Sequence, residues 1–74
     1  MKNISRNEIL AIYRTSLPYG ARIKISQKAG VSITSVHSFF SGRLKSERIE
    51  KAVLEYIADL RKERERLMKE AGLL

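Results

Sequence analysis

One proline and four glycines divide this 74-residue chain and limit what it can fold into. They are Pro18, Gly20, Gly30, Gly42 and Gly72. The stretches between them repeat apolar residues at helical spacing, and only the short run RIKIS at 22–26 alternates as a strand does. One isolated run cannot build a sheet. The pattern therefore predicts an all-α fold with four helices.

Capping residues indicate where the outer two helices begin. Ser5 and Glu8 form a capping-box pattern, so the first helix should cover about 6–16 and end before the proline. Ser46 should cap the last helix, because no glycine or proline follows it until Gly72. This last helix should exceed 20 residues, which is long for so small a chain.

The middle two helices are short and close together. Residues 21–29 carry a single apolar stripe that stops at Gly30, which can adopt the left-handed conformation that ends helices. Ser32 is a good N-cap for a third helix over about 33–41. Only about three residues then separate the second and third helices.

The third expected helix has an apolar side and a polar side. At 100° per residue, its apolar side consists of Val36, Phe39 and Phe40. We interpret the two phenylalanines as core residues and not as surfaces on which bases stack. The opposite side is small, polar and uncharged, with Thr34, His37, Ser38 and Ser41. Such a side suits close approach to another surface, or simply solvent.

Positive charge is concentrated in the first two-thirds of the chain. Residues 1–48 carry nine lysines and arginines against two acidic residues, whereas residues 49–74 carry six of each. The whole formal charge of +7 thus lies in the first segment. A concentrated basic surface favours a polyanion, with nucleic acid ahead of an acidic protein or an anionic membrane. Solubility alone is the other explanation.

The composition gives little support to an enzyme or a metal protein. His37 is the only histidine, the chain has no cysteine, and the third helix has no carboxylate. We therefore expect no catalytic residues, no metal, no cofactor and no small-molecule ligand. No apolar run reaches the roughly 20 residues of a membrane span, and we expect a mature cytoplasmic protein.

Residues 25–43 carry a recognisable pattern, ISQKAGVSITSVHSFFSGR. It resembles the helix-turn-helix of the lac-repressor and lambda-repressor-like families. The matching positions are Ser26, Gly30, Val31, Val36 and the run 41–43. Three positions depart from the family: Ser26 replaces the usual alanine, Ser41 the frequent asparagine, and Arg22 stands where charge is uncommon. The resemblance is strong over about 20 residues, and over about 50 with the outer helices.

The resemblance implies a four-helix lambda-repressor-like helix-turn-helix domain over 1–60, with 61–74 extending a long C-terminal helix. It implies a small stand-alone bacterial or phage transcription regulator, repressor-like, that inserts helix 33–41 into the major groove of double-stranded DNA. No ligand-binding domain follows, so an inducer-responsive sugar repressor is not supported. The alternative is an antitoxin-like or phage accessory module that binds proteins without specific DNA binding.

The resemblance also assigns roles to individual residues. Ile33 and Thr34 would read base edges, and Ser38 would face the same way one turn later. Ser32, Ser35 and His37 would contact phosphates or the groove wall. The backbone phosphates would be held by Arg22, Lys24, Lys28, Arg43 and Lys45. Because helix 33–41 has no arginine, discrimination per base would be modest or would depend on DNA shape.

The last helix carries a possible dimerisation seam. Leucine or valine recurs every seven residues at Val53, Leu60, Leu67 and Leu74, although Arg64 interrupts the seam. We expect a homodimer through Leu60, Leu67, Met68 and Leu74. The alternative is a solvated helix stabilised by pairs such as Arg61–Glu65 and Arg66–Glu70.

Overall fold

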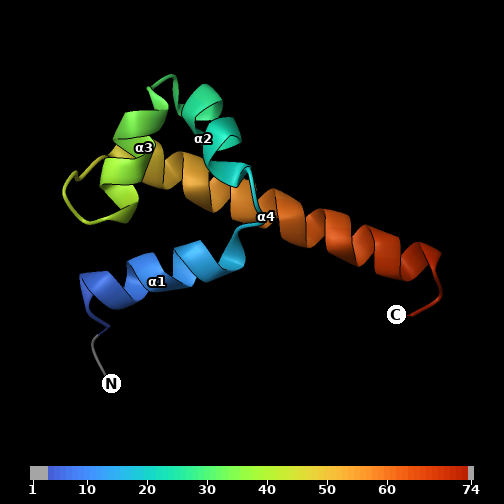
Figure 1. Cartoon of the computed structure of the whole chain (residues 1–74). Coiled ribbons are helices and arrows are strands. Elements are labelled where there is room, and N and C mark those ends of the chain that lie inside the picture. The colour runs from blue at the N-terminus through green and yellow to red at the C-terminus, as the bar shows by residue number, and fades with distance from the viewer. Residues whose placement is uncertain (1–3, 74) are drawn as a thin grey trace.

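The computed structural model describes residues 4–73, and within them it contains four helices and no strand (Figure 1). The helices are α1 (Arg6–Ser16), α2 (Ala21–Ala29), α3 (Ile33–Phe40) and α4 (Glu47–Glu70). The all-α prediction is confirmed, and the third helix ends one residue earlier than expected. No helix in this range has the length and apolar character needed to cross a membrane.

Three serines begin three of the helices, as their positions predicted. The hydroxyls of Ser5, Ser32 and Ser46 each accept a hydrogen bond of 3.2 Å from the amide three residues later. Each such cap contributes about 1 kcal/mol. The helix α2 starts at Gly20 without a side-chain cap, so its position depends on packing against α3 and α4.

The core lies between α4 and the other three helices. Its largest fully buried side chains are Phe39, Phe40, Leu10, Ile25, Ile49, Val36 and Val53. Within α1, Leu10 is 2% exposed, whereas Ile12 is 51% exposed. The reason is that α1 turns Leu10 and Tyr13 inward, while Ile12 lies beside Leu54 in a shallow groove between α1 and α4.

A polar cluster ties α1 to α4 at the edge of this core. The carboxylate of Glu50 accepts hydrogen bonds from Arg6 at 2.9 Å and from the Tyr13 hydroxyl at 2.7 Å. The Arg6 guanidinium also lies 5.3 Å from the centre of the Phe39 ring. The hydrogen bond from Arg6, and then that from Tyr13, lowers the pKa of Glu50 below its ordinary value of 4.5.

The Glu50→Gln variant tests this cluster. It should lower the free energy of unfolding by about 1 kcal/mol at pH 7, since the partly exposed ion pair loses its charge. Because the folded-state pKa is depressed, the carboxylate's contribution is complete above the unfolded value of 4.5 and is lost as the pH falls through the folded value. Urea unfolding of both proteins at several pH values should show the difference shrinking in acid. The exposed Glu65→Gln is the control, and an equal loss there would argue against the cluster.

The second half of α4 extends beyond the other helices (Figure 1). Here Arg66 pairs with Glu70 at 2.9 Å, as expected, and also with Glu63, whereas the expected Arg61–Glu65 pair is not formed. The helix ends in a turn at Gly72, which has a φ of 75°. The amide of Leu73 donates to the Met68 carbonyl at 2.8 Å, a Schellman arrangement that directs Leu73 back along the helix.

Candidate nucleic-acid interface

A tight turn joins α2 to α3 and sets their relative position. Gly30 has a φ of 70°, in the left-handed region, and the amide of Val31 donates to the Ser26 carbonyl at 3.0 Å. Ser32 then caps α3 with extended backbone. Three residues separate the two helices, as the sequence predicted.

The turn favours glycine at position 30 because of its left-handed backbone conformation, and not because a side chain would clash there. A Cβ added at Gly30 would meet no atom within 4 Å. The Gly30→Ala variant should therefore lose about 1 kcal/mol of unfolding free energy through left-handed strain alone. Gly30→Asn should lose less, because asparagine tolerates this conformation. Urea unfolding of the three proteins measures both losses, and equal stability of alanine and glycine would contradict the assigned geometry.

Ser26 is the small residue of α2 that the sequence pattern singled out. It is buried, and its hydroxyl donates to the Ile23 carbonyl at 2.6 Å. The hydrogen bond within α2 satisfies the buried oxygen, so serine at this position leaves no unpaired polar group.

The helix α3 presents the two sides that its sequence predicted. Val36, Phe39 and Phe40 are at most 1% exposed, which confirms them as core residues. On the other side Ser32, Thr34 and His37 are exposed, and Ser35 and Ser38 are half-buried. Ile33 is 36% exposed and lines a cleft together with the turn that precedes α2. The outward surface of α3 is thus small and uncharged.

Arg22 and His37 meet across the α2–α3 unit, which the sequence did not indicate. A guanidinium nitrogen of Arg22 lies 2.8 Å from His37 Nδ1, and the same guanidinium lies 4.6 Å from the centre of the Phe40 ring. Because arginine can only donate, Nδ1 accepts and the ring proton lies on Nε2. Arg22 therefore links α2 to α3, and the exposed His37 keeps an Nε2–H that can donate to an anion.

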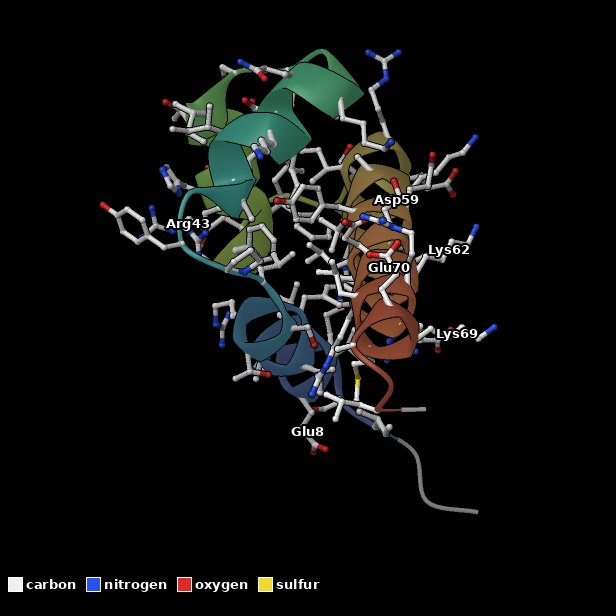
Figure 2. All side chains as sticks on the ribbon, turned by 90° about the vertical axis from the view of Figure 1, so that its right-hand side faces the viewer. Glu8, Arg43, Asp59, Lys62, Lys69 and Glu70 are labelled. Carbon is white, nitrogen blue, oxygen red and sulfur yellow. The ribbon has the colours of Figure 1, made fainter. Side chains whose placement is uncertain are left out.

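The other basic residues assigned to phosphates differ in their surroundings. Lys28 pairs with Glu55 of α4 at 3.6 Å. Lys24, Arg43 and Lys45 are exposed and form no ion pair within residues 4–73. Figure 2 shows Arg43 on the opposite side of the bundle from Asp59 and Lys62 of α4. Three of the five assigned cations are thus free for a ligand.

A cleft of about 430 Å³ adjoins the first turns of α2 and α3. Two arginines, one histidine and no carboxylate line it, together with apolar side chains. Arg14 donates to the Phe40 carbonyl at 2.7 Å, and Tyr19 is fully exposed at the rim. Sequence reasoning missed both residues, although Arg14 in the last turn of a helix followed by Leu17-Pro18 could have indicated a cation near that turn. The lining residues are Arg14, Leu17, Pro18, Tyr19, Gly20, Ala21, Arg22, Ile23, Ile33 and His37.

Three of the four residues assigned to dimerisation, Leu60, Leu67 and Met68, lie on the second half of α4. Leu67 is 52% exposed, and Leu60 and Met68 are half-buried. Leu74 lies outside the described residues. Within residues 4–73 no three histidine, cysteine, aspartate or glutamate side chains gather as a metal site requires.

Comparison of the chain with protein-family models, with curated proteins and with solved structures found no match.

Proposed function

We propose that this protein is a sequence-specific DNA-binding transcription regulator, repressor-like, of bacterial or phage origin. The α2–α3 unit would act as a lambda-repressor-like helix-turn-helix and insert α3 into the major groove. A homodimer would bind a palindromic site in the cytoplasm and block polymerase by occupancy. The observation that carries the proposal is the pairing of a fully buried apolar side of α3 with an exposed, small, uncharged side.

The short, uncharged side chains on the outward side of α3 and the basic residues beside it favour this orientation of the helix. Short hydroxyl side chains let a helix approach base edges closely, and the major groove is wide enough for one helix. Thr34 and Ile33 at the N-terminal end of α3 would contact bases, and Ser38 would follow one turn later. The first amides of α3 would meet a phosphate. Lys24, Arg43 and Lys45 would hold the neighbouring phosphates, since they pair with no carboxylate within residues 4–73.

Of the two assigned cations that already have a partner, only Lys28 would have to leave it, at small cost. Lys28 would leave Glu55, but an exposed ion pair contributes about 0–1 kcal/mol. Arg22 would keep its place over Phe40 and offer its remaining N–H groups to a phosphate. Arg14 is a further candidate, because it lines the same carboxylate-free cleft.

Selection from random duplex oligonucleotides with the purified protein tests the proposal. It should enrich a palindrome whose half-sites are related by two-fold symmetry. Enrichment of no sequence would favour the second candidate function, a helical module that binds another protein. The observation in favour of that candidate is the apolar surface at the end of α4, where Leu67 and Leu73 are 52% and 69% exposed.

A further inference from the structure

The cleft that adjoins the first turns of α2 and α3 has the size and lining of a small-molecule site. Its volume of about 430 Å³ lies within the roughly 300–1,000 Å³ of ligand pockets. Its apolar lining comes from three places: Leu17 and Pro18 in the turn before α2, Ile23 in α2, and Ile33 in α3. These side chains favour a ligand with an apolar body, because a bare anion gains nothing from contact with them.

Three basic side chains from three different helices line the same cleft. They are Arg14 of α1, Arg22 of α2 and His37 of α3. Neither arginine forms an ion pair within residues 4–73, and no carboxylate of these residues lines the cleft. A cleft with basic groups of one sign and an apolar wall attracts an anion. No single sequence segment carries this arrangement, since the basic groups belong to separate helices.

Both arginines are held in place and keep donors for a ligand. Arg14 donates from one terminal nitrogen to the Phe40 carbonyl at 2.7 Å, and Arg22 from one to His37 Nδ1 at 2.8 Å. A guanidinium has five N–H groups, so each arginine has others left. Because these contacts already order the side chains, binding an anion costs little of their freedom.

We propose that this cleft binds a small monocarboxylic acid with an aromatic body. The carboxylate would accept hydrogen bonds from Arg14 or Arg22. The ring would lie against Ile23 and Ile33, and the fully exposed Tyr19 at the rim offers its own ring for offset stacking. A singly charged carboxylate suits the apolar wall better than a phosphate monoester, whose second charge makes removal from water more costly.

The bound acid would compete with DNA. Arg22, Ile33 and His37 line the cleft and are also among the residues assigned to DNA. The acid would cover them and place a negative charge where phosphates approach. DNA would in turn weaken binding of the acid by the same factor, since coupling between two ligands is reciprocal. This competition rests on the proposed function, whereas binding of the acid to the free protein does not.

Titration of the full chain with 2-naphthoate, without DNA, tests the site. Nitrogen-15 NMR should show saturable shifts of the Gly20, Ile23 and Ile33 amides, with a Kd of about 1 mM or below. The neutral 2-naphthamide has the same shape and should bind about ten-fold more weakly, as should inorganic phosphate, which lacks the ring. The absence of a saturable shift, or equal binding of the acid and the amide, would overturn the inference.

Two variants test the assigned contacts. Arg14→Gln should weaken 2-naphthoate binding about ten-fold, and Tyr19→Ala about three-fold. Lys62→Gln removes the same charge from α4, outside the cleft, and should leave binding unchanged. Equal affinities of Arg14→Gln and Lys62→Gln would contradict the assigned anion contact. Urea unfolding checks that Arg14→Gln folds, and the comparison of acid with amide tests the charge in the unaltered chain.

Fluorescence anisotropy with the selected duplex tests the competition. The apparent affinity for DNA should fall by the factor 1 + [acid]/Kd, which is about ten-fold at about nine times the Kd of 2-naphthoate. Unchanged DNA affinity at saturating 2-naphthoate would overturn the competition. A chain that binds 2-naphthoate but selects no DNA would support the ligand site and contradict the proposed function. A chain that selects a palindrome but does not bind 2-naphthoate would have the opposite consequence.

Discussion

Replacing Phe39 by alanine should lower the free energy of unfolding by about 3–5 kcal/mol. Phe39 is fully buried at the meeting point of three aromatic or cationic groups. Its ring centre lies 6.5 Å from that of Tyr13, 5.3 Å from that of Phe40, and 5.3 Å from the Arg6 guanidinium. A domain of this size has about 4–11 kcal/mol in total. The variant should therefore lose a large share of the stability of the fold.

Thermal and urea unfolding followed by circular dichroism measure this loss. The matched control is Tyr19→Ala, which removes a fully exposed aromatic ring and should change stability by less than about 0.5 kcal/mol. A Phe39→Ala protein that folds normally and loses only affinity for nucleic acid would mean that the ring stacks on bases. That result would reverse the assignment of the inner and outer sides of α3.

Replacing Thr34 by aspartate should reduce binding to the selected DNA about 100-fold or more without unfolding the protein. Thr34 is exposed and is the second residue of α3. A carboxylate there would face phosphates and base edges, and juxtaposed like charges cost several kcal/mol. The same carboxylate lies at the positive end of α3, where it should raise helix stability by about 0.3–1 kcal/mol. Loss of binding thus could not arise from loss of folding.

The control for this variant lowers the net charge by the same one unit elsewhere. Lys62→Gln lies on α4, on the opposite side of the bundle from Arg43 (Figure 2). Fluorescence anisotropy with a labelled duplex should show near wild-type affinity for Lys62→Gln. Equal losses in the two variants would indicate that only net charge matters and that α3 has no special place in binding.

Local signals were enough to predict the four helices. Serine caps and left-handed glycines depend on residues within a few positions of one another, and so Ser5, Ser32, Ser46 and Gly30 can be read directly from the chain. The two sides of α3 also follow from spacing alone, because a helix with two adjacent phenylalanines has only one way to bury both.

Contacts between distant residues could not be predicted in this way. The pairing of Arg22 with His37, of Lys28 with Glu55, and of Glu50 with Arg6 depends on how helices lie across one another. The burial of Leu10 and the exposure of Ile12 in α1 likewise depend on how α1 lies against α4. For this reason the sequence could assign basic residues to phosphates as a group, and the structure distinguishes those already paired with carboxylates from those that are free.

The most direct test of the central claim is equilibrium binding to two duplexes of equal length, one carrying the selected palindrome and one its scrambled sequence. Titrations at several salt concentrations should give at least about 10³-fold tighter binding to the palindrome. For both duplexes the affinity should fall steeply with salt as Lys24, Arg43 and Lys45 displace counterions. Equal affinity for the two duplexes would contradict sequence-specific recognition by α3.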